Sequence, residues 1–295
     1  MTVNPWVWFC ILAIVATTAK VFYIKKIGRL ISNLHILFFA RLVTCILLVP
    51  FYSEISIPTN MAFWWATLSA VALTTLAGYA YIEALRSGAL SHVVPIQATI
   101  PVFMVVIIAL VYQEMPSWTS TFFLLGAMLS LGIVLLSNAN PNDVVDHPDK
   151  LWKPVLLSLL AALLYAASTV LDRVAIASTE YGALNYTFIW NAISLMVLFA
   201  LLRGRISIDI SGVRARWMLI VTFCSAVAFL SQQYAVQNSL YMVNGVTFVK
   251  GLVMLHIAVL IILGVLFFGE KPRRSVLVAS FISLLFSVGL VISSV

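Results

Sequence analysis

The sequence is poor in charge: Lys, Arg, Asp and Glu make up 9% of its 295 residues, whereas roughly a quarter is usual in a soluble domain. Hydrophobic residues make up 63%. The long apolar runs lack the polar and apolar alternation that is typical of strands in membrane β-barrels. These absences exclude a water-soluble globule, and the sequence predicts an all-α integral membrane protein.

Cysteine is also scarce, and the three residues Cys10, Cys45 and Cys224 lie inside apolar runs without a CxxC motif. Neither a disulfide framework nor a zinc site is indicated. The sequence has no HExxH, GxSxG or Walker A motif and no His or Asp cluster with metal-ligand spacing. We therefore expect no enzymatic activity, no cofactor and no metal, and an ATP-driven pump would need a partner subunit.

What the sequence has in abundance is apolar runs of membrane-spanning length. A span needs about 20 mostly apolar residues, and polar breaks divide the chain into ten such runs. We expect transmembrane helices near residues 5–24, 34–52, 61–82, 90–112, 119–138, 151–176, 184–202, 216–236, 243–268 and 275–294.

The positive charges predict the orientation, because short cytoplasmic loops retain Lys and Arg. The net charge of +7 does not indicate a nucleic-acid partner, since these residues lie between apolar runs and form no basic face. We expect both termini on the extracytoplasmic side of a cytoplasmic (inner) membrane. The loops after the odd-numbered spans hold thirteen basic residues: Lys25, Lys26, Arg29, Arg86, Lys150, Lys153, Arg203, Arg205, Arg214, Arg216, Lys271, Arg273 and Arg274.

An internal repeat divides the chain into two halves. The fourth span ends at Glu114-Met-Pro116 and the ninth at Glu270-Lys-Pro272, 156 residues apart, and similar segments surround Gly132 and Gly289. The loop after Glu114 lacks basic residues and the loop after Glu270 has three. Matching loops would differ in this way if they lay on opposite sides of the membrane. We expect two inverted five-helix repeats, residues 1–139 and 151–295, joined by a linker at 140–150.

In these features the chain resembles the EamA-type transporters of the drug/metabolite transporter superfamily over nearly its whole length. The resemblance is carried by the two five-span repeats, by Arg41 in FFARLV and Pro101 in TIPVFM, and by Glu114 and Glu270. It implies a transporter in which spans 1–4 and 6–9 surround a central cavity. Two features depart from the pattern: Ile257 stands about where the second half would have a matching proline, and the termini of many relatives are cytoplasmic.

Charged residues at membrane depth are the first candidates for the site, because ionisable groups inside a membrane usually face a cavity or a partner. Lys20, Arg41 and Lys250 are the deepest, and all three would favour a carboxylate or phosphate group. Each also has a simpler interpretation. Lys20 could snorkel to the interface, Arg41 could be architectural, and only Lys250 is too deep to snorkel easily.

Other polar residues in the spans could complete a binding wall or carry protons. Lone histidines and amides in a membrane are as often packing residues as ligands, and an adjacent Asp172 and Arg173 could neutralise each other. Asp172, Glu83 and His92 are the candidates for proton coupling. The candidate substrate-binding residues are Lys250, Arg41, Lys20, His92, Gln97, Thr99, Trp190, Asn191, Gln233 and Thr247.

The leading hypothesis is a secondary transporter that moves a small organic anion or amphipathic metabolite by alternating access. The alternatives are export of amino acids or cationic drugs, flipping of a lipid-linked phosphate, and a membrane sensor that transports nothing. The expected partners are a small-molecule or lipid-like substrate and the bilayer, with the protein a monomer or a homodimer.

Overall fold

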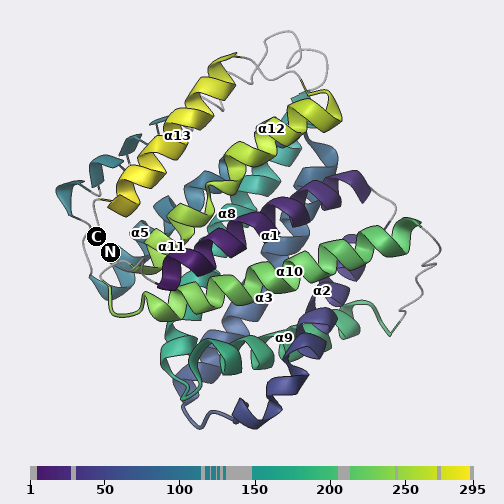
Figure 1. The fold of residues 1–295 in the computed structure, drawn as a ribbon, viewed down its shortest axis with the longest axis vertical. Coiled ribbons are helices and arrows are strands. Elements are labelled where there is room, and N and C mark those ends of the chain that lie inside the picture. Colours follow the sequence, from purple (N-terminus) through teal and green to yellow (C-terminus); the bar gives the residue numbers. More distant parts are fainter. Residues whose placement is uncertain are drawn as a thin grey trace.

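The structure is a computed structural model, and its elements run from α1 to α13 (Figure 1). No β-strand occurs in the described residues, so the expected all-α fold is confirmed in this part of the chain. The described residues are 5–27, 31–113, 117–119, 121–123, 125–126, 129–130, 148–204, 213–242, 245–270 and 274–292.

The first helices follow the apolar runs, and polar residues begin and end them. Ser32 caps α2 by accepting a hydrogen bond from the His35 amide at 3.3 Å, and Asn60 caps α3 by accepting one from Ala62 at 2.9 Å. Such caps satisfy amides that have no partner in the first turn. The elements are α1 (Pro5–Ile27), α2 (Asn33–Leu48), a 3-10 segment (Val49–Glu54), α3 (Met61–Ser87), α4 (Leu90–Val93), a 3-10 turn (Pro95–Thr99) and α5 (Ile100–Tyr112).

The later helices repeat this order. They are α8 (Pro148–Ala177), α9 (Gly182–Leu201), α10 (Val213–Asn238), α11 (Gly245–Val253), α12 (His256–Phe268) and α13 (Arg274–Ile292). Eight helical segments of the described chain are long and apolar enough to cross a membrane. They correspond to the expected spans 1–4 and 6–9, and they indicate a multi-pass membrane protein.

The remaining two expected spans are not among those eight. The tenth corresponds to α13, whereas most of the fifth, like Glu114, Pro116 and most of the 140–150 linker, lies outside the described residues. The count of ten and the inverted relation of the halves therefore stay predictions.

Spans 4 and 9 differ from the expectation of continuous helices. Span 4 is α4, a 3-10 turn and α5, and span 9 is α11, a turn at Met254 and Leu255, and α12. Both α5 and α12 have 13 residues, and each ends at a residue with positive φ, Gln113 at 57° and Gly269 at 63°. These two residues are 156 positions apart, the separation of the Glu-x-Pro motifs.

Small residues explain the closest helix pairs. The largest interfaces join α3 to α8 and α1 to α10. On α3, Ala70 and Gly78 are buried, and a Cβ on Gly78 would lie 2.9 Å from Leu37 Cδ2. On α8, Ala162 and Ala166 are fully buried. Small side chains let membrane helices approach closely, so packing and not propensity fixes these pairs.

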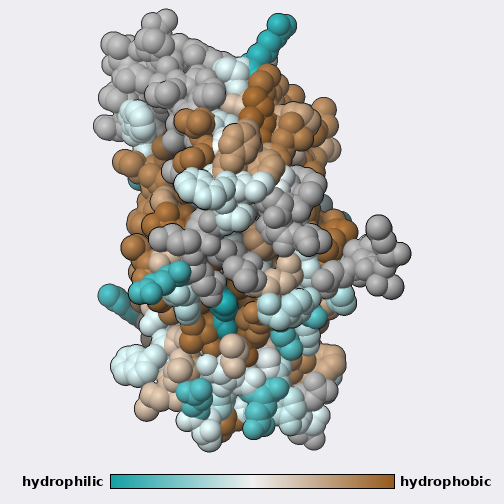
Figure 2. All heavy atoms as spheres, turned by 90° about the vertical axis from the view of Figure 1, so that its left-hand side faces the viewer, coloured by the Kyte–Doolittle hydropathy of each residue, from teal (hydrophilic) through white to brown (hydrophobic). Residues whose placement is uncertain are grey.

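The outer surface is apolar, as a lipid-facing surface must be. Leu110 is 78% exposed and Leu266 70%, and Figure 2 shows apolar side chains spread over one face of the molecule. A soluble monomer rarely exposes so much contiguous apolar surface. The bilayer is the solvent that fits it.

The bundle has two ends, which we name by their connections. Helix α1 ends and α2 begins at the α1–α2 end, and α2 ends and α3 begins at the α2–α3 end. Because successive spans run in opposite directions, α9 and α11 begin at the α2–α3 end, and α1 begins there too (Figure 1). The basic residues that lie at the α1–α2 end include Lys25, Lys26, Arg86, Lys153, Arg203, Arg216 and Arg274.

Candidate functional site

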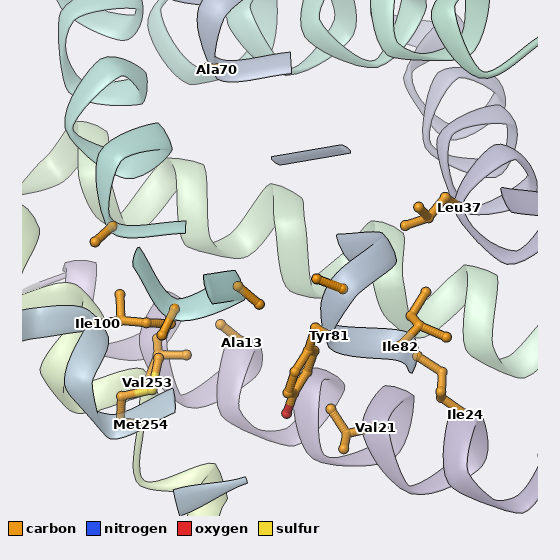
Figure 3. Close-up of a cluster of buried hydrophobic side chains, with 14 of the residues drawn as sticks. Ala13, Val21, Ile24, Leu37, Ala70, Tyr81, Ile82, Ile100, Val253 and Met254 are labelled. Carbon is orange, nitrogen blue, oxygen red and sulfur yellow. The ribbon is translucent and has the colours of Figure 1, made fainter. Parts of the chain in front are cut away.

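A cavity of about 140 Å³ lies inside the bundle. It is much larger than the roughly 15 Å³ that one water needs. Its apolar wall includes Ile100, Val253 and Met254 on one side and Ile24, Leu37 and Ile82 on another, with the Tyr81 ring between them in Figure 3. Its polar lining is Thr17, Lys20, Arg41, Thr74, Tyr81, Gln97, Tyr165, Ser168, Thr169, Asp172, Ser225, Gln232, Gln233, Lys250 and His256.

The breaks in spans 4 and 9 contribute directly to this wall. Gln97 and Ile100 come from the break in span 4, and Val253, Met254 and His256 come from the break in span 9. Interrupted helices at membrane depth occur where backbone lines a cavity or is buried in protein. Such breaks near the bilayer midplane are where transporters commonly place their sites.

Arg41 is held in the cavity wall by aromatic rings. Its Cζ lies 4.3 Å from the centre of the Trp190 ring and 5.5 Å from that of Phe229, and these two rings lie 4.6 Å apart. The residue is 8% exposed, and its Nε has no hydrogen-bond partner in the described chain. Stacking on aromatic faces stabilises a guanidinium without neutralising it. Its positive charge is therefore available to the cavity.

Asp172 is fixed by two donors from neighbouring helices. Tyr186 of α9 donates its hydroxyl to Oδ1, and Gln233 of α10 donates from Nε2 to Oδ2 at 3.2 Å. The carboxylate is 5% exposed, and Lys250 is close enough to interact with it electrostatically. Arg173 instead places its guanidinium 5.3 Å from the Tyr112 ring. Asp172 thus brings a negative charge into the cavity.

The two lysines of the lining come from opposite ends of the chain. Lys250 on α11 is 9% exposed, and Lys20 on α1 is half-buried. No described residue accepts a hydrogen bond from either ammonium group. With Arg41 they bring three basic side chains to a lining whose one described carboxylate is Asp172. A buried charge is costly unless it is paired, so the arrangement favours a bound anion.

Gln97 serves partly as a structural residue. Its Nε2 donates to the Ser158 carbonyl at 2.9 Å and to Ser158 Oγ at 2.8 Å, and Ser158 in turn donates to the Val93 carbonyl at 2.9 Å. These bonds tie the break in span 4 to α8. Gln97 still lines the cavity through the rest of its side chain.

The structure brings together six of the residues that the sequence selected: Lys20, Arg41, Gln97, Asp172, Gln233 and Lys250. Four others are buried but are not part of the described lining: Thr99, Trp190, Asn191 and Thr247. Glu83 lies near the end of α3 and accepts a hydrogen bond from Asn33 at 3.1 Å. The side chain of His92 lies outside the described residues.

Two faces of the lining escaped the sequence analysis. Thr74, Gly78 and Tyr81 lie on one face of α3, and Tyr165 and Ser168 lie on one face of α8. Their spacing of three or four residues is the helical period. That period in hydroxyl-bearing residues was the available signal, but charge drew attention elsewhere.

Glu270 lies outside the cavity and joins the two broken spans. Its carboxylate accepts hydrogen bonds from the amides of Leu90 at 2.7 Å and Ser91 at 2.9 Å, at the start of α4. Lys25 fastens the same region by donating to the carbonyls of Leu85 at 2.9 Å and of Gly88. The sequence suggested that Glu270 only ends a helix, and the structure adds this contact across 180 residues.

Metal chemistry has no evident place here: no group of three or more His, Cys, Asp or Glu side chains in the described part of the chain could hold a metal ion.

Comparison with known proteins gives a family and a fold. Residues 4–137 match the sequence model of the EamA-like transporter family. One solved structure, described only as "Crystal structure of protein", has a TM-score of 0.59 and 12% sequence identity to this chain, and the match covers 98% of this chain and 96% of that one. At that identity the likeness shows a shared fold. No curated protein matches the sequence significantly.

Proposed function

With residues 4–137 a member of the EamA-like transporter family, we propose that this protein is a secondary active transporter for a small organic anion or amphipathic metabolite. The observation that carries the proposal is the cavity with Lys20, Arg41 and Lys250 in its wall. Carboxylates and phosphates pair well with guanidinium and ammonium groups. A site at the breaks of two discontinuous spans fits the general plan of secondary transporters.

Each lining group has a proposed role. Arg41, held flat by Trp190 and Phe229, presents its donors to the anionic group, and the two lysines contribute point charges. The Gln233 side chain orients Asp172. The apolar side of the cavity, with Ile100, Val253 and Met254, would receive the less polar part of the substrate.

We propose that the substrate crosses by alternating access between two inverted halves, residues 1–139 and 151–295. The matched breaks in spans 4 and 9 and the turns at Gln113 and Gly269 support a duplicated architecture. The basic residues at the α1–α2 end support a cytoplasmic location for that end and extracytoplasmic termini. A reporter fused after Val295 that is active only in the cytoplasm would contradict this orientation.

A second candidate cargo carries a positive group, as amino acids and cationic drugs do. Asp172 favours it, because a carboxylate in the same cavity as three basic groups could pair with a substrate ammonium. Competition by neutral and cationic compounds but not by anions would favour this cargo. Asp172 is also the candidate proton carrier that lines the cavity, whereas Glu83 is fixed at the end of α3.

Transport in proteoliposomes tests the proposal. Wild-type protein should take up radiolabelled anions from a panel of phosphate esters and dicarboxylates, and Lys250→Ala should lower that uptake about tenfold or more, since hydrogen bonds between ions are worth roughly 1.5–3 kcal/mol. Lys153→Ala is the matched control, because Lys153 is exposed and lies outside the cavity. Equal uptake by wild type and Lys250→Ala for every anion would contradict the role of Lys250.

A further inference from the structure

Helix α9 carries a stripe of buried polar side chains that the cavity does not use. The stripe consists of Thr187, Trp190, Asn191 and Ser194, which lie on one face of α9 because they are three or four residues apart. All four are 0% exposed. Each has an atom without a hydrogen-bond partner in the described chain: Thr187 Oγ1, Trp190 Nε1, Asn191 Oδ1 and Ser194 Oγ.

Such a stripe is costly to bury. An unsatisfied buried polar group costs about 1–3 kcal/mol, and most buried polar atoms in proteins have a partner. Asn191 meets only part of its need by donating from Nδ2 to the Thr187 carbonyl at 2.6 Å. Apolar side chains of similar size would stabilise this arrangement better. The polarity of the stripe therefore points to a second arrangement in which these atoms meet polar partners.

Helix α2 shows what that arrangement is. In the proposed repeats α2 and α9 occupy the same place in their halves, and they pack against each other. Ile36, Leu37, Ala40 and Arg41 of α2 line the cavity, and none of its described lining residues comes from α9. The α2 positions lie in the half of the helix nearest the α1–α2 end. One member of the pair is open to the cavity and the other is closed.

The stripe lies immediately behind the cavity wall. Trp190 packs under the Arg41 guanidinium at 4.3 Å and against the Phe229 ring, and both of these residues line the cavity. A shift of α9 relative to α2 and α10 would therefore be enough to place the stripe on the cavity surface. Small shifts of packed helices are a common form of such transitions.

We propose that the Thr187–Ser194 face of α9 lines the transport pathway when the protein opens toward the α2–α3 end. There its polar atoms bind water and the polar groups of the transported anion. The inference rests on the proposed alternating access. It adds the surface that the substrate meets in the state opposite to the one described.

Cysteine labelling tests this face directly. Thr187→Cys and Ser194→Cys change little in size, and they would be made singly in protein in which Cys10, Cys45 and Cys224 are replaced by serine. The probe is a membrane-impermeant thiosulfonate reagent that carries a sulfonate group, applied to vesicles from either side. Met196→Cys is the matched control, because Met196 lies on the same helix but is 69% exposed on the outer surface.

The reagent should modify both stripe cysteines from the side of the α2–α3 end at least about tenfold faster than Met196→Cys, since even a minor state of a few per cent exposes them repeatedly. Modification no faster than that of Met196→Cys from either side would overturn the inference. The labelling involves no transport step, so it decides the fate of the α9 face by itself. Failure of wild-type protein to take up any anion of the panel would contradict the proposed function alone.

Discussion

Spans 4 and 9 have the same backbone plan but different chemistry. Each is interrupted near its middle, continues as a 13-residue helix and ends in a left-handed turn. Span 4 has prolines at the break, Pro95 and Pro101, whereas span 9 breaks at Met254 and Leu255 without any. Only span 9 places a lysine in the cavity, and span 4 contributes an amide.

The difference teaches that the break is a property of the architecture and not of proline. A proline removes an amide donor and so favours an interruption. Span 9 is interrupted where its backbone meets the cavity, with His256 Nδ1 lying 2.7 Å from the Val253 carbonyl. The duplicated part is the shape, and the charge was free to differ between the halves.

The largest stability effect should come from the contact that joins the two spans. Glu270→Ala removes the acceptor for the Leu90 and Ser91 amides, so we expect the free energy of unfolding to fall by about 2 kcal/mol. Unfolding titrations in detergent would measure it. Glu270→Gln keeps one acceptor oxygen and should lose about half as much. Unchanged stability in Glu270→Ala would mean that the spans are not held together here.

Exchanging the residues of the two left-handed turns should give smaller, opposite effects. Gly269→Ala should cost about 1 kcal/mol and Gln113→Gly should gain a similar amount, because a side chain is strained at positive φ. No atom lies within 4 Å of a Cβ on Gly269, so the cost there would come from the backbone alone. The same titrations measure both changes. Shifts of the same sign would show that the two turns are not equivalent.

The smallest effect should come from the proline that span 9 lacks. Pro101→Ala should change stability by no more than about 0.5 kcal/mol, because Pro101 stands in the first turn of α5, where its missing amide costs little. Thermal melting with and without the substitution would measure this. A loss of several kcal/mol would instead make proline the cause of the break in span 4.

Much of the fold could be predicted because a bilayer permits few structures. Spans 1–4 and 6–9 were predicted from apolar length alone, and the described helices follow them within a few residues. The break in span 9 could not be predicted, since Ile257 and its neighbours read as a continuous apolar run. A break of this kind is decided by helix packing around the cavity, which local sequence does not encode.

The site was predicted in part, by charge. Lys20, Arg41, Asp172 and Lys250 were recognisable because a charge at membrane depth needs a polar surrounding. Thr247 was expected to share the wall with Lys250, yet it is 1% exposed and is not part of the described lining. Helical spacing defines a face of about a third of the circumference, and only tertiary packing selects the side chains that reach the cavity.

The ring of Trp190 gives the protein an optical reporter at its centre. The indole is shielded from outside and lies against the one guanidinium of the cavity lining. Indole emission responds to a nearby charge, so an anion that draws Arg41 away from the ring would alter its colour or its brightness. Occupancy of the cavity could then be followed by light, without a label and without knowing the cargo beforehand.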